Sequence, residues 1–221
     1  MRPVLVITGT RREGAVLDEG PGIKIIAGGG DAEFLARQLA REAKGAAGCI
    51  SFGMCGALDP ALRIGDWVIG TILVGKTEGA CDPRWIASLS SSLPAARAGP
   101  IYADGRLIAN AADKASLHRE TGALAGDMES HIAARAAAEA GLPFAILRCI
   151  SDEADANLPP AIAVAMRPGG GLALGAAFSS IMKQPSQLSG LIRSVADFRH
   201  AYAALATGVK AVGPCLAFDR R

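Results

Sequence analysis

Val4-Leu5-Val6-Ile7-Thr8 is a continuous apolar run in which β-branched residues prevail. An apolar run without polar alternation is typical of a central strand that is covered on both faces, as in a parallel sheet between helices. The run ends at Gly9, and Thr10-Arg11-Arg12-Glu13 is then expected to form a polar loop at the carboxyl end of the strand.

Strands and helices are expected to alternate along the rest of the chain. The expected strands lie at 23–27, 49–52, 67–74, 122–127 and 144–150, with a strand and turn within 99–108. The expected helices lie at 32–44, 83–89, 112–121, 128–140 and 188–206. Asp31 is the expected N-cap of the first helix, and Gly141 is expected to end the fourth. This order predicts one domain, residues 1–221, with an α/β fold in three layers, an α/β/α sandwich that binds ligands outside the carboxyl ends of its strands.

Composition and charge narrow the function classes. The formal net charge is only +2, and no basic run with interleaved aromatic residues occurs, which disfavours a nucleic-acid partner. The cysteines are odd in number and lack CxxC spacing, which predicts a reducing compartment without a disulfide framework. They are Cys49, Cys55, Cys81, Cys149 and Cys215. No signal peptide and no uninterrupted apolar stretch of about 20 residues is found, so a cytoplasmic protein is expected.

Two acidic stretches follow predicted strands. Gly126-Asp127-Met128-Glu129-Ser130-His131 opens an alanine-rich helical run, and the apolar strand from Phe144 to Ile150 ends in Ser151-Asp152. A carboxylate can accept hydrogen bonds from two vicinal ribose hydroxyls, and a second carboxyl group can protonate a leaving base. Acidic neighbours also stabilise the positive charge that develops on the sugar, as in glycoside hydrolysis. Together the two stretches predict cleavage of a nucleoside N-glycosidic bond.

Further motifs carry a family resemblance. Ser51-Phe52-Gly53-Met54-Cys55-Gly56-Ala57-Leu58, followed by Leu62-Arg63-Ile64-Gly65-Asp66, resembles the nucleoside phosphorylase and nucleosidase superfamily. Asp127-Met128-Glu129-Ser130 and the strand ending in Ser151-Asp152 resemble its ribose-binding and purine-binding motifs. The resemblance runs from the first strand to about Asp155. It implies a central mixed, mostly parallel sheet, a small-molecule nucleoside as substrate, and a homo-oligomer.

The resemblance implies a role for each matching residue. Asp152 would be the general acid at purine N7 and would bind the exocyclic amine of adenine, with Ser151 beside it. Glu129 would hold the ribose hydroxyls, and Met128, preceded in the motif by Asp127, would lie beneath the sugar. Each residue has a plainer alternative. Asp152 would be a helix cap or loop residue, Glu129 a residue favoured by the helix macrodipole, and Met128 a core residue.

The nucleophile is left open between water and phosphate. Glu13 resembles the loop glutamate that orients the attacking water in nucleosidases, with a solvated loop charge as the alternative. Ser51, with the backbone from Gly53 to Gly56, and Gly28–Gly30 at a helix start are candidate contacts for phosphate or ribose, unless they are only tight turns. Phosphate would need fixed cations, for which the candidates are Arg11, Arg12, Arg63 and Arg148.

No cofactor and no metal ion is expected, because a leaving purine needs only a proton. The histidines show no metal-ligand spacing with each other or with cysteine, and they are read as ordinary helical residues. They are His118, His131 and His200.

The C-terminal third bears on the substrate. Leu158-Pro159-Pro160 and Gln184-Pro185-Ser186-Gln187-Leu188 resemble a bacterial branch, the hopanoid-associated phosphorylases. That branch implies adenosylhopane as substrate, phosphate as nucleophile and adenine as product. Apolar residues in this third would line an entrance for a triterpenoid tail, make peripheral contact with a membrane, or pack against the sheet or another subunit. They are Ile162, Val164, Met166, Leu172, Leu174, Phe178, Ile181 and Met182.

Two other readings remain beside this one. The first is a hydrolytic methylthioadenosine/adenosylhomocysteine nucleosidase in purine and methionine salvage. The second is a catalytically silent nucleoside-binding protein on the same fold. The presence of both Glu129 and Asp152 disfavours the silent reading, because binding alone needs no acid at N7.

Overall fold

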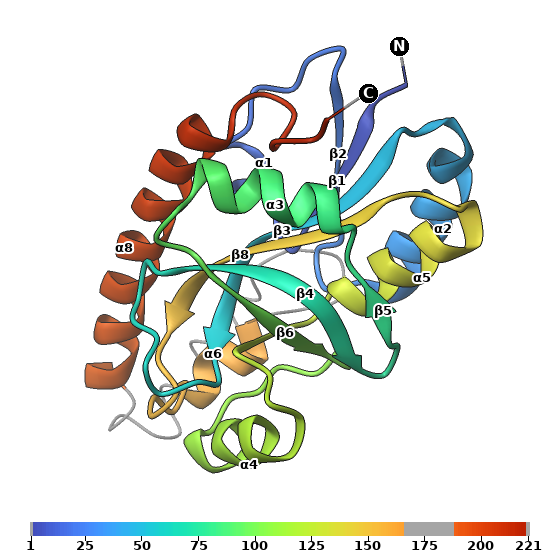
Figure 1. Ribbon diagram of the computed structural model, residues 1–221. Coiled ribbons are helices and arrows are strands. Elements are labelled where there is room, and N and C mark those ends of the chain that lie inside the picture. The colour runs from blue at the N-terminus through green and yellow to red at the C-terminus, as the bar shows by residue number, and fades with distance from the viewer. Residues whose placement is uncertain (1, 166–187, 220–221) are drawn as a thin grey trace.

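Eight strands form one mixed sheet at the centre of the molecule (Figure 1). The computed structural model describes residues 2–165 and 188–219. The strands are β1 (Val4–Thr8), β2 (Ile23–Ala27), β3 (Gly48–Ala57), β4 (Trp67–Gly75), β5 (Gly79–Ala80), β6 (Arg97–Ala103), β7 (Ala125–Asp127) and β8 (Phe144–Asp152). The expected runs 4–8 and 23–27 coincide with β1 and β2, and the others are found with shifted ends.

Most strand pairs are parallel. The main order is β2-β1-β3-β7-β6-β4-β5, and β8 pairs with both β3 and β4. Strand β8 runs parallel to β3 but antiparallel to β4. Because β8 pairs with both, a closed circuit of hydrogen-bonded neighbours runs through β3, β7, β6, β4 and β8. The pairs of β3 with β7 and of β4 with β5 are also antiparallel, which makes the sheet mixed and mostly parallel, as expected.

Helices cover both faces of the sheet. They are α1 (Arg11–Gly14), α2 (Ala32–Glu42), the 3-10 turn η1 (Ala43–Gly45), α3 (Pro83–Ser92), α4 (Ala111–Thr121), α5 (Ser130–Ala140), α6 (Pro160–Ala165) and α8 (Leu188–Val212). Helices α2 and α5 pack together on one face, and α3 and α8 lie on the other (Figure 1). The three-layer α/β/α architecture expected from the sequence is confirmed.

Two buried clusters fill the spaces between these layers. Leu35 and Leu39 of α2 pack with Ile132 of α5 against one face of the sheet. Trp85 of α3 and Leu205 of α8 pack against the other face. Burial of apolar side chains on both faces explains why β1 reads as an unbroken apolar run, since all five of its residues are buried.

Helix ends follow the local sequence signals. The Asp31 carboxylate accepts a hydrogen bond from the Phe34 amide at 2.8 Å, which confirms the expected N-cap of α2. Gly141 ends α5 in the left-handed conformation, as expected of a residue that lacks a Cβ atom.

Three segments differ from their expected form. Thr10-Arg11-Arg12-Glu13 was expected to be a loop, but α1 begins there, because Thr10 and Glu13 form a reciprocal capping box. Strand β3 continues to Ala57, five residues past the expected end at Phe52, because β8 pairs with it along this length. Helix α8 continues to Val212, beyond the expected end at residue 206.

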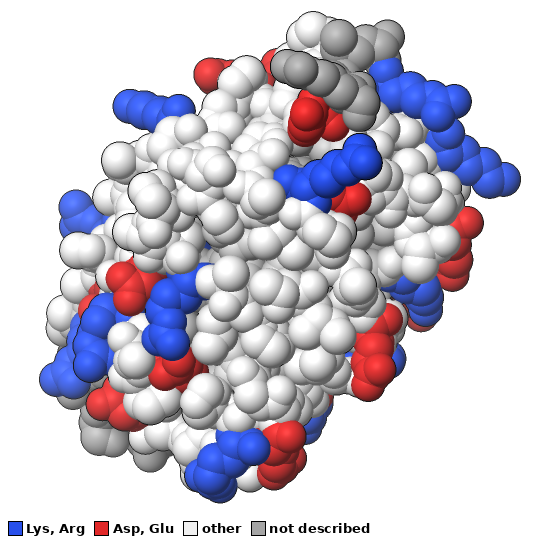
Figure 2. Space-filling view, in the orientation of Figure 1, with Lys and Arg blue, Asp and Glu red and all other residues white. Residues whose placement is uncertain are grey.

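Surface features are unremarkable for a chain of low net charge. Figure 2 shows acidic and basic side chains interspersed on the face of Figure 1, with broad uncharged areas between them. In residues 2–165 and 188–219, no helix is long and apolar enough to cross a bilayer. Of the apolar residues expected to line an entrance, those from Met166 to Met182 lie outside the described part of the chain.

Candidate active site

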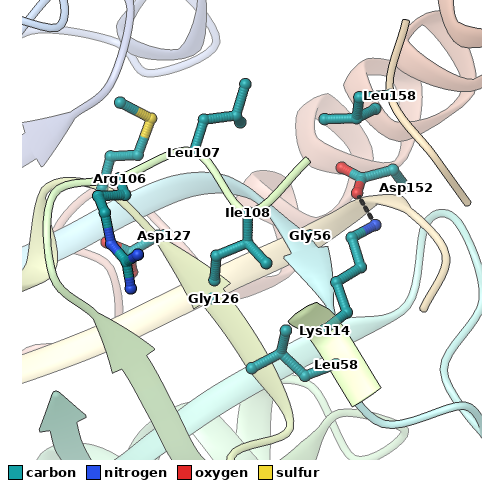
Figure 3. A pocket seen from close by; sticks show the side chains of 11 residues that line it. Gly56, Leu58, Arg106, Leu107, Ile108, Lys114, Gly126, Asp127, Asp152 and Leu158 are labelled. Carbon is teal, nitrogen blue, oxygen red and sulfur yellow. Dashed lines mark hydrogen bonds and ion pairs between the residues drawn. The ribbon is translucent and has the colours of Figure 1, made fainter. Parts of the chain in front are cut away.

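A pocket opens where strands β3, β7 and β8 end (Figure 3). All three strands meet it with their carboxyl ends, which is where ligands bind in sheets of this kind. The turn after β6 and one lysine from α4 complete the wall. The lining residues are Gly56, Leu58, Arg106, Leu107, Ile108, Lys114, Gly126, Asp127, Met128, Asp152 and Leu158.

Asp152, the expected general acid, lies in this pocket at the end of β8. Its Oδ2 atom accepts a hydrogen bond of 2.5 Å from Lys114 Nζ, and its Oδ1 atom lies 3.0 Å from the Ser151 hydroxyl. The Asp152 side chain is 14% exposed, whereas the Lys114 side chain is fully buried. Figure 3 shows the lysine reaching from α4 to the carboxylate.

A β-bulge aims Asp152 into the pocket. Along the pairing of β3 with β8, Cys55 pairs with Ile150 but the next residue, Gly56, pairs with Asp152, which leaves Ser151 as the extra residue. The absence of a side chain at Gly56 makes room for the carboxylate, since a Cβ atom there would lie 2.9 Å from Asp152 Oδ2. Ser151 fixes the bulge by placing its hydroxyl 3.1 Å from the Cys55 carbonyl.

A second group of polar residues lies under the start of α5. Asp127 Oδ1 accepts hydrogen bonds from the Glu129 and Ser130 amides, at 2.9 and 2.7 Å. Its Oδ2 atom lies 3.0 Å from Arg148 Nε and accepts a bond from the Ser130 hydroxyl. Asp127 therefore caps the helix and holds the arginine, and both of its oxygens are engaged by the protein.

Ser51 belongs to the same buried group. Its hydroxyl oxygen accepts a hydrogen bond of 2.5 Å from Arg148 Nη2 and lies 2.9 Å from the Ser130 hydroxyl oxygen. Both Ser51 and Arg148 are fully buried. Because the Ser51 hydroxyl is buried, it is not placed to contact a ligand directly. Any effect of Ser51 on a ligand would act through Arg148, to which it is hydrogen-bonded.

Glu129, the expected ribose ligand, is the N-cap residue of α5 and directs its carboxyl group toward the loop after β1. A Cβ atom on Gly9 would lie 3.2 Å from Glu129 Oε1 and 3.1 Å from Glu13 Oε2, so both acids flank this glycine. Arg148 Nη2 lies 3.9 Å from Glu129 Oε2. Burial raises the pKa of Glu129 to about 8, Arg148 opposes the rise, and the acids Asp127 and Glu13 add to it.

Glu13 is buried rather than solvated. Its Oε2 atom accepts hydrogen bonds from the Thr10 amide and hydroxyl, at 2.6 and 2.9 Å, and its Oε1 atom accepts one of 2.7 Å from the Met54 amide. Gly53, at a φ of +144°, approaches so closely that a Cβ atom would lie 2.5 Å from Glu13 Oε1. The glycine-rich part of β3 therefore holds a carboxylate, not an open anion nest.

The two groups of residues are neighbours along β3. Met54 contacts Glu13 and Gly56 contacts Asp152, and residues two apart on a strand are separated by roughly 7 Å. Asp127 and Met128 line the pocket from the other side, and Glu129 follows them in the chain. The fold thus brings Asp152, Met128, Glu129 and Glu13, which were expected from the sequence to form one site, to the same end of β3, although Glu129 and Glu13 do not line the pocket itself.

Other expected contacts do not converge on the pocket. Arg11, Arg12 and Arg63 are exposed, and none of them lines it. Gly28 lies against the Glu129 side chain, where a Cβ atom would be 3.6 Å from Glu129 Cγ, so this glycine-rich turn makes room for the acid. Within residues 2–165 and 188–219, no group of three histidine, cysteine or acidic side chains is placed to hold a metal ion.

Lys114 is the functional candidate that sequence reasoning missed. Its partner Asp152 lies 38 residues later in the chain, so no local motif connects the two. A lysine in a polar helix is ordinarily predicted to lie at the surface. The capping box of Thr10 and Glu13, by contrast, had a recognisable signal in its T-x-x-E spacing.

Comparison with known proteins gives one family match. The family model described as Phosphorylase superfamily matches residues 72–165, which include β7, Glu129 and all of β8. None of the curated proteins compared with this chain matches it.

Solved structures share the fold along almost the whole chain. An S-adenosylhomocysteine nucleosidase from Streptococcus pyogenes, in complex with 5-methylthiotubericidin, is 19% identical, with a TM-score of 0.65 over 96% of this chain and 98% of that one. A 5'-methylthioadenosine/S-adenosylhomocysteine nucleosidase from Neisseria meningitidis, in complex with methylthio-immucillin-A, is 19% identical, with a TM-score of 0.65 over 97% and 99%. A futalosine hydrolase from Helicobacter pylori is 16% identical, with a TM-score of 0.64 over 95% and 96%.

The family match and the motifs at 51–66, 127–130 and 151–152 lie on the fold that these nucleosidases share. The resemblance to the nucleoside phosphorylase and nucleosidase superfamily is thus supported by the family match over residues 72–165, and the solved structures show that the fold is shared over almost the whole chain.

Proposed function

We propose that this protein cleaves the N-glycosidic bond of a 5'-substituted adenosine and releases adenine. The observation that carries the proposal is the placement of the acids: Asp152 lines the pocket together with Met128, and Glu129, the next residue, lies outside the lining with Glu13 beside it at Gly9. An acid near the base can neutralise the negative charge on the leaving purine by protonation, and acids near the sugar can stabilise its developing positive charge.

Asp152 acts on the base. Its carboxyl group faces the pocket at a strand end, within reach of a purine N7 atom and an exocyclic amine. An aspartate accepts a hydrogen bond from a 6-amino group, so adenine suits this position better than a 6-oxo purine.

Glu129 and Met128 act on the ribose. Glu129 accepts hydrogen bonds from the two vicinal hydroxyls once its carboxyl group is ionised, and this contact steadies the developing cation. Met128 lines the pocket and supplies an apolar, polarisable surface beneath the sugar ring.

Glu13 supports water as the nucleophile. Its buried carboxylate is fixed by three hydrogen bonds next to Glu129, where it can orient a water molecule and take up its proton. Phosphate would enter a region that holds the acids Glu13, Asp127 and Glu129, and the nearby guanidinium groups already have partners: Arg148 contacts Asp127 and Ser51, and Arg106 pairs with Asp104. This charge balance disfavours a phosphate dianion and favours hydrolysis.

Adenosylhopane, with phosphate as the co-substrate, is a second candidate. Leu107, Ile108 and Leu158 give the pocket an apolar side that suits a hydrocarbon 5'-substituent. The methylthio group of methylthioadenosine is also apolar, so the two substrates share the chemistry of this wall and differ in size.

Turnover with defined substrates tests the proposal. Purified protein is incubated with methylthioadenosine or adenosylhopane, with and without phosphate, and free adenine is measured by chromatography. We expect adenine from methylthioadenosine without phosphate. Strict dependence on phosphate would overturn the hydrolytic mechanism, and absence of adenine from both substrates would overturn the proposed function.

Site variants assign the roles. We expect Asp152→Asn, Glu129→Gln and Glu13→Gln each to lower turnover by at least ~100-fold, the usual contribution of a positioned acid or base. Asp155→Asn and Glu139→Gln are matched controls at exposed positions close in sequence to Asp152 and Glu129, and they should retain full turnover. Wild-type turnover in the first three variants would refute the assigned roles.

A further inference from the structure

Lys114 is the only fully buried lysine among the described residues. Its ammonium group has three N–H donors, and each has an acceptor: Asp152 Oδ2 at 2.5 Å, the Glu153 carbonyl at 2.8 Å and the Ala156 carbonyl at 3.3 Å. The only carboxylate among these acceptors is that of Asp152, which lines the pocket (Figure 3).

This pairing is costly if it is only structural. Removing an ammonium ion from water costs several kcal/mol, and a neutral donor could bind the two carbonyl groups equally well. The Lys114 side chain also lines the pocket beside Asp152. The burial of the Lys114 ammonium group against Asp152 is therefore better explained by a role in the reaction than by a role in stability.

We propose that Lys114 is the source of the proton that Asp152 transfers to the leaving purine; this inference rests on the proposed function. In the structure Asp152 Oδ2 accepts its hydrogen bond from Lys114 Nζ, so Lys114 is the proton donor in direct contact with this carboxyl group. One proton moves from Lys114 Nζ to the Asp152 carboxylate, and from Asp152 to purine N7.

The step is balanced in protons and electrons. The electron pair of the bond between C1' and the purine nitrogen goes to the purine, which the proton from Lys114 neutralises. Water adds its oxygen to C1' and gives one proton to Glu13. Asp152 begins and ends as a carboxylate, and Lys114 ends as a neutral amine that regains a proton from solvent after adenine leaves.

A change of leaving group separates proton delivery from structure. The probes are methylthioadenosine and the matched 4-nitrophenyl 5-methylthio-riboside, because 4-nitrophenolate leaves as a stable anion without protonation. Asp152→Asn should lose adenine release and keep nitrophenolate release, which shows that the pair of probes reports on the acid.

Two Lys114 variants then distinguish its proton from its charge. Lys114→Met removes both, whereas Lys114→Arg keeps the cation but not the donation, because a guanidinium is not deprotonated in proteins. We expect each variant to lower adenine release by about 100-fold. Release of nitrophenolate should stay within a few-fold of wild type, which also shows that the variant is folded. Lys44→Met, at an exposed lysine, should match wild type with both probes.

Each other outcome overturns the inference. Adenine release by Lys114→Arg at the wild-type rate would mean that only the charge matters. Equal loss with both probes in both variants would mean a structural role, and wild-type adenine release by Lys114→Met would mean no role. Failure of the proposed function is distinguishable, because the wild-type protein itself would then release no adenine.

Discussion

Arg148 Nε lies 3.0 Å from Asp127 Oδ2, and neither side chain is more than 1% exposed. The pair ties the middle of β8 to the end of β7 directly beneath Glu129. Because Asp127 also caps α5, this contact sets the position of the helix start that carries the proposed ribose ligand.

Removing the guanidinium should destabilise the fold. Arg148→Met leaves Asp127 buried without its cation, and breaking a buried pair in this way costs about 3–5 kcal/mol. Urea denaturation measures the free energy of unfolding. Arg135→Met, at an exposed position on α5, is the control and should change it by less than ~0.5 kcal/mol. A loss below ~1 kcal/mol for Arg148→Met would contradict the structural role of the pair.

Stability should depend on pH through Glu129. In the folded protein its carboxyl group keeps its proton up to a pKa of about 8, whereas an unfolded glutamate releases it near 4.5. The folded state binds more protons in this window, so the contribution of Glu129 to stability is complete below pH 4.5 and is lost as the pH rises through 8. Glu129→Gln removes this dependence, so its advantage over wild type should grow from pH 5 to pH 9 in thermal melts. Parallel curves for the two proteins would be inconsistent with the raised pKa.

Binding of a nucleoside should release a proton. If Glu129 accepts hydrogen bonds from both ribose hydroxyls, it must ionise, and its raised pKa leaves it protonated in the free protein at pH 7. Titration calorimetry of a non-cleavable adenosine analogue, in buffers with different ionisation enthalpies, counts the protons released. We expect close to one proton at pH 7 for wild type and none for Glu129→Gln, and equal values in both proteins would refute this role.

A methyl group at Gly56 should impair the acid. In Gly56→Ala the new Cβ atom would lie 2.9 Å from Asp152 Oδ2, so the carboxyl group must move. A displacement near 1 Å can cost about 100-fold in rate, and we expect a loss of roughly 10- to 100-fold in adenine release. Gly45→Ala is the matched control, since its Cβ atom would meet nothing within 4 Å. Equal turnover of the two variants would show that Asp152 tolerates the shift.

The cysteines should react very unequally. Burial raises the pKa of Cys49, Cys81 and Cys149 to about 12, and it raises that of Cys55 as well. Their thiolate fraction at pH 8 is therefore small, and reagents reach them only when the protein opens. Cys215 is half-buried, so a chromogenic thiol reagent should modify one cysteine quickly and four slowly. Fast modification of two or more thiols in the native protein would contradict this burial.

Sequence patterns predicted those parts of the fold that depend on neighbouring residues. The apolar runs of β1 and β2, the Asp31 cap and the left-handed Gly141 all follow from local chemistry, and the structure confirms them. The length of β3 did not follow, because Gly53 to Ala57 are extended through their pairing with β8 and, at Gly56 and Ala57, with β7.

The site was predictable where motifs carry it. Met128 and Asp152 were singled out from the chain alone, and both line the pocket. The assignment of catalytic roles to Asp152, Glu129 and Glu13 stays a prediction until turnover is measured. Lys114 could not be found in this way, because its partner is distant in sequence and no local pattern marks a lysine as buried.

The extra residue in β8 has a consequence for how such chains can diverge. Arg148 contacts Asp127, Asp152 lines the pocket, and the bulged Ser151 lies between them on β8. Loss of Ser151 would remove the irregularity that redirects the Asp152 side chain, together with the hydroxyl contact to Cys55 that holds it, while leaving the pairing of Arg148 unchanged. We therefore expect functional homologues to vary in residue type between positions 148 and 152, but to keep the same number of residues between these two positions.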